Sequence, residues 1–223
     1  MGILMQSGGG KPTIMFRPVS LTGLYLRCAY RSAETLLAIK DDNDQIDRRV
    51  ELAISTILWA TLALEAGANE IAESIIHSTE LAIFDRCKKK YSKPDKVSRL
   101  IWKWHWLFKL GPKVEIELSD PLFVATEGLI QLRHLLTHYK LQDTARKLYF
   151  EPSPPVLNED GFYQRTEWNI DMKPTKIEPS LIESAFLNQS ASKHYMSARE
   201  VFIQWELKNG RGVEVFSKSF PAL

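Results

Sequence analysis

The chain has 223 residues, of which 44% are hydrophobic and 25% are charged, and its formal net charge is +2. This composition excludes a disordered chain and predicts one globular domain with a sizeable core, and so small a net charge does not by itself indicate a nucleic-acid-binding protein. Cys28 and Cys87 have neither metal-ligand spacing nor a disulfide-rich context, which is typical of a cytoplasmic protein. No run of about 18 apolar residues is present, so we expect no membrane span.

Positive charge is concentrated in one part of the chain. From Arg86 to Lys113 the sequence has ten basic residues and a single acid, Asp95, so the rest of the chain is acidic overall. A basic segment on an acidic body suggests that one face meets an anionic partner. A solvated lysine-rich loop explains the same pattern, and the sequence leaves both explanations open.

The predicted elements begin with a helix over residues 20–40, for which Ser20 is the expected N-cap. The acidic run at 41–44 predicts a break. From 45 to about 84, apolar residues recur at three- and four-residue steps, which predicts one long helix. Gly67 inside this helix is expected to allow a neighbouring helix to approach closely.

Proline and glycine delimit two further helices. Pro94 predicts a loop after the long helix, because proline disfavours helix at that point. Asp95 is the expected N-cap of a short helix that Gly111–Pro112 ends. Pro121, with a fixed φ suited to the first helical position, then opens the next helix.

The last third of the chain changes character. Residues 141–180 are proline-rich and aperiodic, with one short strand expected at 162–168, and a final helix is expected over 179–208. Residues 1–19 are expected to be a flexible leader, since their GGGKPT lacks the flanking positions of a phosphate-binding loop. The sequence therefore predicts an all-α domain over 20–223, an antiparallel bundle of four to five helices with a proline-rich irregular insertion before the last helix.

The helix that begins at Pro121 carries a polar stripe near its end, in the string LRHLLTHYK. At about 100° per residue, the leucines of this helix share one face and the polar residues lie roughly opposite. The stripe consists of Glu127, Gln131, His134 and His138, with Arg133 at its border.

An ordinary solvated face explains the stripe as well, although two histidines beside an arginine displace better helix formers. His134 and His138 are also spaced to share a metal ion, but a third ligand is not evident, and Leu135 stands where a metalloprotease motif has Glu. We therefore expect no metal and no cofactor. Arginine and histidine together suit metal-free phosphodiester cleavage, since histidine transfers protons near neutral pH and a guanidinium stabilises the phosphate. RNA supplies its own 2′-OH nucleophile.

These residues resemble the signature of the HEPN domains (higher eukaryotes and prokaryotes nucleotide-binding), helical bundles of which many are metal-independent ribonucleases. The family motif is R-x(4–6)-H, with a polar residue after the arginine. Here RHLLTH, from Arg133 to His138, is R-x4-H with His134 in the polar position. The upstream ILWATLALEAGANEIAES is similar to the alanine-rich helix of the family, so the resemblance covers about residues 45–82 and 120–140.

The resemblance implies a homodimer whose two motif helices form one composite cleft, with a toxin or defence role and an antitoxin-like protein partner. It implies that Arg133 binds the phosphate, that His138 is the general acid and base, and that His134 orients Arg133 or contacts RNA. The implied product has a 2′,3′-cyclic phosphate end. Some members lack activity, so a non-catalytic module that dimerises or binds a partner protein is the alternative.

Two further groups of residues are candidates for supporting roles. Helical spacing places Trp104 nearly opposite Trp102 and Trp106, so the latter two are expected to anchor their helix and Trp104 to be available for stacking on a base. Plain packing of all three explains the pattern equally well. Glu65 and Asn69, one turn apart on the long helix, are candidates to brace Arg133 or a histidine. The full set of expected RNA contacts is Lys88, Lys89, Lys90, Trp104 and His105.

Overall fold

The structure is a computed structural model that describes residues 20–40, 45–138, 145–149, 176–180, 183–184, 191–210 and 219–223. This part of the chain is mostly helical and contains one small two-stranded sheet. The expected all-α class is therefore confirmed at that level.

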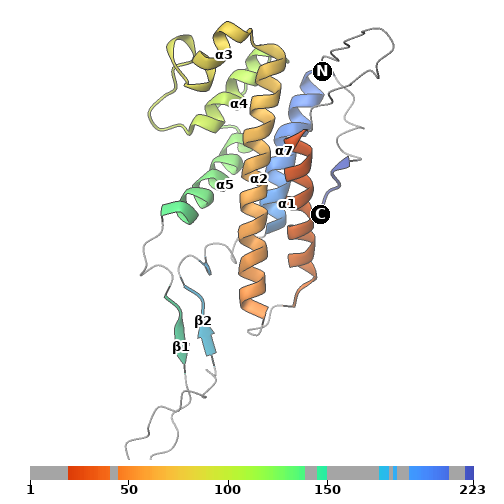
Figure 1. The fold of residues 1–223 in the computed structure, drawn as a ribbon, viewed down its shortest axis with the longest axis vertical. Coiled ribbons are helices and arrows are strands. Elements are labelled where there is room, and N and C mark those ends of the chain that lie inside the picture. Colours follow the sequence, from red (N-terminus) through yellow and green to blue (C-terminus); the bar gives the residue numbers. More distant parts are fainter. Residues whose placement is uncertain are drawn as a thin grey trace, which may run out of the picture.

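The elements follow one another with short connections in the first two thirds of the chain (Figure 1). The two strands are antiparallel, with Leu148 opposite Ile177. The elements are α1 (Leu21–Ala38), α2 (Ile46–Ile75), α3 (Ser78–Asp85), the 3-10 turn η2 (Lys89–Tyr91), α4 (Arg99–Leu110), α5 (Pro121–His138), β1 (Lys147–Tyr149), β2 (Lys176–Glu178) and α7 (Ala191–Lys208).

Helices α1, α2 and α7 lie side by side along the long axis of the molecule (Figure 1). The start of α1 is held against the far half of α2, because the Glu70 carboxylate accepts from the backbone nitrogens of Leu21 (2.8 Å) and Thr22 (3.2 Å). A carboxylate at this position satisfies helix donors that have no partner within α1. Helices α1 and α2 are therefore antiparallel.

Gly67 of α2 is where α7 approaches most closely. A Cβ atom at this position would lie 2.2 Å from Cε1 of Phe202, so only glycine leaves room for that ring. This confirms the expected role of Gly67. Trp205, one turn further along α7, lies near Gly111 and therefore beside the later end of α2. Helix α7 thus runs in the same direction as α2.

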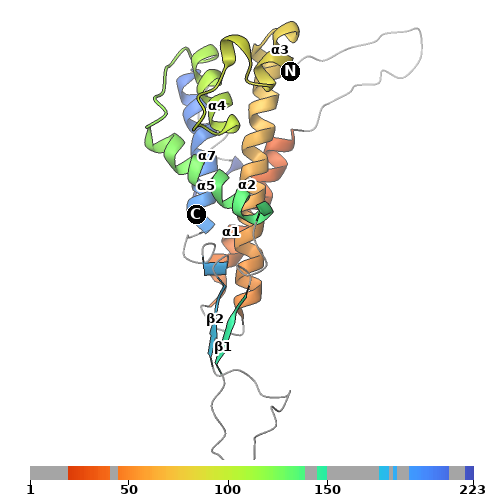
Figure 2. The same ribbon diagram turned by 90° about the vertical axis from the view of Figure 1, so that its left-hand side faces the viewer.

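Helices α4 and α5 cover the side of α2 that faces away from α1, and Figure 2 shows them in front of α2. Both contribute large side chains to the common core, among them Leu107, Phe108, Phe123 and Leu129, each at most 1% exposed. At the opposite end of the molecule the β1–β2 pair extends beyond α1 and α2 (Figure 2). The placement of α5 matters most here, because it carries the predicted motif.

Arg146 ties the sheet to the helices. Its Nε donates to both carboxylate oxygens of Glu183 at 2.8 and 2.9 Å, and its guanidinium also pairs with Asp47 at the start of α2. These partners raise the pKa of Arg146. Burial alone would raise the pKa of Glu183, but hydrogen bonds from Arg146 and Ser180 outweigh it and lower that pKa.

Several predicted helix boundaries are confirmed. The Ser20 side chain caps α1 by accepting from the nitrogen of Gly23, and α4 ends at Leu110, directly before Gly111. Pro121 is the first residue of α5, and the Asp120 carboxylate accepts from the nitrogen of Leu122 at 2.8 Å.

Two boundaries differ from the prediction. The expected single helix from 45 to 84 is two helices, because Ile76 leaves helical geometry with φ −101° and ψ 133° and the His77 ring then caps α3. The cap of α4 is Ser98, which accepts from the nitrogen of Ile101, so the prediction of Asp95 was wrong. Periodicity alone does not detect a break that falls between two apolar stretches.

Some predictions fall outside the described residues, namely the leader at 1–19, the run at 41–44 and the strand at 162–168. The insertion is described only at its edges, where it holds β1 and β2, and the described part of the last helix begins at Ala191.

The length and apolar composition of α2 would suit a membrane-spanning helix, the single such case among the described residues. However, 56% of that apolar stretch is buried inside the protein, and a mostly buried core helix of a soluble protein has the same length and composition. The expectation of no membrane span stays a prediction.

Candidate functional site

The end of α5 presents Arg133 and two histidines at different angles around the helix axis. Leu129 and Leu132 of α5 are buried, and these contacts fix the rotation of the helix. The Arg133 side chain is 35% exposed, and both His134 and His138 are exposed. The wet face predicted by periodicity therefore holds both histidines, and Arg133 lies at its border.

Arg133 is turned toward α2. Its Nη2 lies 3.8 Å from a carboxylate oxygen of Glu65, which is longer than a hydrogen bond but within ion-pairing reach. Both side chains are more than a third exposed, so the pair is weak and each group keeps room for another partner. Glu65 thus faces the arginine of the motif, in the supporting position for which the sequence made it a candidate.

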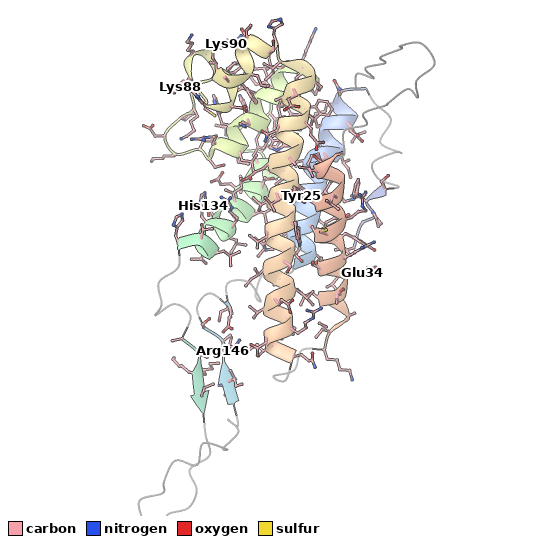
Figure 3. The ribbon with its side chains drawn as sticks, viewed as in Figure 1. Tyr25, Glu34, Lys88, Lys90, His134 and Arg146 are labelled. Atoms are coloured by element: carbon pink, nitrogen blue, oxygen red, sulfur yellow. The ribbon has the colours of Figure 1, made fainter. Side chains whose placement is uncertain are left out.

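His134 and His138 contact each other rather than Arg133. Their rings are stacked with an interplanar angle of 19° and centroids 6.1 Å apart. Figure 3 shows His134 at the outer end of α5, on the side away from α2. Because His138 is the last residue of α5, both rings lie at the end of the helix with solvent around them.

Within one chain, the arginine and the second histidine of the motif point to different sides of α5. Five residues on a helix correspond to roughly 140° of rotation and about 7.5 Å of rise. Arg133 consequently points to the α2 side, and His138 points away from it. A phosphate bound closely by this Arg133 would lie on a different side of the helix from His138 of the same chain.

Asn69 belongs to a different set of contacts. Its Oδ1 accepts from Nζ of Lys103 at 3.1 Å, and the same ammonium group donates to Asp85 at 2.7 Å. Asn69 therefore faces α4 and not the histidines. Together with Arg99, these α2 and α4 residues line a cavity of ≈ 240 Å³ that Glu65 also borders.

The sequence prediction did not single out Arg99 and Lys103. Both pairs, Glu65 with Asn69 and Arg99 with Lys103, are spaced by four residues and so each lies on one helix face. The four-residue spacing is the sequence signal for each pair, but it does not predict that these faces of α2 and α4 lie against each other.

The expectation that Trp104 is available for base stacking is wrong. This side chain is 0% exposed, and its Nε1 donates to the backbone oxygen of Leu64 at 3.3 Å. Its ring packs edge-on against Phe202 with centroids 5.2 Å apart. Trp104 anchors α4 to α2 and α7, so no base can reach it.

The outer side of α4 is also aromatic, and it packs on the turn that follows α3. Trp102 donates from Nε1 to the backbone oxygen of Tyr91 at 2.7 Å, and Trp106 packs edge-on against the same tyrosine. These two tryptophans are anchors, as expected, but for a different neighbour. His105 stacks on Trp102 at 4.9 Å and its Nδ1 lies 2.9 Å from the backbone oxygen of Ile116, so its ring already has partners within the fold.

The lysine cluster lies apart from the histidines. Lys90 donates to both carboxylate oxygens of Glu80 at 2.8 and 2.7 Å, and Lys88 and Lys89 are exposed. The hydrogen bonds from Lys90 and Tyr91 lower the pKa of Glu80. Figure 3 shows Lys88 and Lys90 at the α3 end of the molecule and His134 at the end of α5.

The rest of the polar stripe borders a groove between α5 and the start of α4. Glu127 and Gln131 lie along a cavity of ≈ 440 Å³ whose apolar lining includes Val97, Ile101 and Phe123. The stripe is thus divided into an earlier half beside an apolar groove and a later half with two exposed histidines.

Comparison with known proteins does not add a relationship. No protein-family model matches this chain, and no curated protein or solved structure does. The site is therefore interpreted from its own residues.

Proposed function

We propose that this protein is a metal-independent endoribonuclease of the HEPN type. The observation that supports the proposal most is the end of α5, where His134 and His138, one and five residues after a weakly paired Arg133, are exposed. Groups held loosely at a surface are available to a substrate, whereas Trp102, Trp104 and His105 of α4 are bonded within the fold. We also propose that α1, α2, α4, α5 and α7 form the helical bundle that carries this motif.

The proposed reaction is transfer of a phosphodiester within the RNA strand. A histidine removes the proton of a ribose 2′-OH, and the 2′ oxygen attacks phosphorus as the bond to the 5′ oxygen breaks. The leaving 5′ oxygen receives a proton, so the products are a 2′,3′-cyclic phosphate and a 5′-OH. Arg133 stabilises the negative charge that builds on the phosphate oxygens.

In this proposal the active site is shared by two chains. Arg133 and His138 of one chain point to different sides of α5, so a second copy of the helix is needed to bring an arginine and a histidine to the same phosphate. A two-fold axis near the stripe would pair them reciprocally. His138 is the general acid and base, and His134, which stacks on it, positions its ring or contacts RNA.

The experiment compares the parent protein with the Arg133→Ala and His138→Ala variants on several single-stranded RNAs in the presence of a chelator. Both changes should lower the cleavage rate by a factor of about 100 or more, because each removes a group that acts in the transition state. Gln131→Ala, an exposed change on the same stripe, is the matched control and should cleave as the parent does. Circular dichroism verifies that each variant is folded, and mapping of the product ends identifies the cyclic phosphate.

A non-catalytic interaction module is the second candidate, and the groove beside Glu127 and Gln131 favours it. Val124, at 57% exposure, lies in this groove and gives a partner protein an apolar contact. If intact RNA is recovered from the parent and from both variants alike, the ribonuclease proposal fails and this candidate remains.

A further inference from the structure

The cavity between α2 and α4 combines cationic side chains with hydrogen-bonding ones. Its lining consists of Glu65 and Asn69 from α2 and Arg99, Leu100 and Lys103 from α4. Its volume of ≈ 240 Å³ is below the range of roughly 300 to 1,000 Å³ that holds a drug-sized molecule. A cavity of this size suits a single phosphate and sugar of a longer strand.

Arg99 is the cation in this cavity that is free to bind. It is exposed, and within the described part of the chain no carboxylate lies at ion-pairing distance from it. Lys103, by contrast, is 13% exposed and bridges Asp85 and Asn69. Lys103 therefore adds positive charge from a fixed position, and Arg99 has the planar donor group that matches a phosphate.

The thiol of Cys87 lies within electrostatic reach of the two cations that line the cavity. Burial raises the pKa of Cys87, but the charges of Arg99, Lys103 and Lys93 act in the opposite direction. Two cations of α4 and one from the loop before it thus act on the same thiol, which lies near the cavity. An anionic group placed there would be attracted by all three.

The cavity also contains an acceptor. Glu65 offers carboxylate oxygens, while the Asn69 oxygen is already engaged by Lys103, which leaves the Asn69 amide nitrogen to donate. A carboxylate disfavours a bare phosphate but accepts readily from a hydroxyl group. The cavity lining therefore fits a phosphate together with a ribose hydroxyl, which RNA has and DNA lacks at the 2′ position.

We propose that this cavity is a ribonucleotide subsite, in which Arg99 and Lys103 bind the phosphate next to the scissile one and Glu65 accepts from a ribose 2′-OH. This proposal rests on the proposed ribonuclease function. The subsite adjoins the motif, because Glu65 of its lining also faces Arg133. An RNA strand then passes from α4 over Arg133 toward the catalytic histidine that the second copy of the chain supplies. The subsite gives the enzyme a preference for RNA before chemistry begins.

The test measures binding without cleavage, in full-length protein that carries His138→Ala. Fluorescence anisotropy follows a labelled single-stranded RNA and its DNA counterpart over a range of salt concentrations. Adding Arg99→Gln should weaken RNA binding by roughly three- to tenfold and reduce the slope of log K against log salt by about 0.7, the value for one lost phosphate contact. Arg31→Gln removes the same charge from the exposed face of α1 and should change neither quantity.

A second variant tests the hydroxyl contact. Glu65→Met keeps the side-chain length without the carboxylate acceptor and should remove most of the preference for RNA over DNA. Equal effects of Arg99→Gln and Arg31→Gln overturn the subsite, as does equal affinity of the His138→Ala protein for RNA and DNA. If the parent cleaves RNA but the Arg99→Gln variant binds it normally, the subsite is rejected and the ribonuclease proposal stands. Arg99-dependent RNA binding without any cleavage by the parent rejects the ribonuclease instead.

Discussion

Helices α4 and α5 both carry histidine and basic residues, but they differ in how those groups are used. On α4, the indole nitrogens of Trp102 and Trp104 donate to backbone oxygens, and His105 contacts the Ile116 oxygen. At the end of α5, His134 and His138 contact mainly each other. These aromatic groups of α4 are therefore part of the fold, whereas the two histidines of α5 are available to a ligand.

The difference explains why composition alone misled the interpretation of α4. A tryptophan among lysines suggests a nucleic-acid surface, but a buried indole with a satisfied nitrogen contributes to stability. The exposed groups that remain on this helix are the cations Arg99 and Lys109, of which Lys109 pairs with Glu115 at 2.9 Å. Availability, rather than residue type, separates the two helices.

The largest expected effect on stability is that of Trp104→Ala. Removing a fully buried indole leaves a cavity between α4, α2 and α7 and should lower the free energy of unfolding by about 3 to 5 kcal/mol. His138→Ala is the contrasting change and should alter it by less than about 0.5 kcal/mol, because that side chain is at the surface. Urea unfolding of the two variants measures both values. Similar losses for the two would remove the distinction between the helices.

The second-largest expected effect is on the pH dependence of stability, and it comes from a buried histidine on α7. His194 is 3% exposed, its Nε2 has no hydrogen-bond partner among the described residues, and burial, with a smaller effect of Lys193, lowers its pKa from 6.5 to about 4. Between these pH values the unfolded chain binds the proton more readily than the folded one. Stability from this group is therefore present above pH 6.5 and is lost as the pH falls toward 4, by up to about 1.4 kcal/mol per pH unit.

His194→Leu should remove this part of the pH dependence. Unfolding measured at pH 7.5 and at pH 5 should give a smaller difference for the variant than for the parent. Ser197→Ala, a change without a titrating group on the same helix, should keep the difference of the parent. An unchanged pH dependence in His194→Leu would contradict the assignment.

The smallest effect tests the outer side of α4. His105→Ala removes the stacking on Trp102 and the contact with the Ile116 oxygen, and should lower stability by about 1 kcal/mol. RNA binding by the folded variant should equal that of the parent, since His105 already has partners within the fold. A large loss of RNA affinity without loss of stability would restore its predicted role as an RNA contact.

Helix ends with a local chemical signal could be predicted from the sequence. Ser20, Gly111 and Pro121 each act through their own backbone or side chain, and each marks the boundary that the structure has. The break at Ile76 could not be predicted in this way, because both flanking stretches are apolar and histidine is an unusual cap. Periodicity also placed the α5 stripe on the outer face.

The orientation of α4 required tertiary information. Trp104 and the pair Trp102 and Trp106 lie on opposite faces, and both faces are covered, one by α2 and α7 and the other by Tyr91. A helix that packs on two sides has no single apolar stripe, so its rotation depends on which neighbours are present. For the same reason the approach of Arg99 and Lys103 to Glu65 and Asn69 was not foreseen.

The contact between Gly67 and Phe202 also bears on the order in which the protein folds. The α1–α2 contact at Glu70 joins residues 49 positions apart, whereas Gly67 and Phe202 are separated by about 135. Closing the longer loop costs about 1 kcal/mol more in chain entropy, so we expect α1 and α2 to associate first and α7 to dock late. Helix α7 then completes the core last. Weakening its contacts with α2 would therefore speed unfolding more than it slows folding.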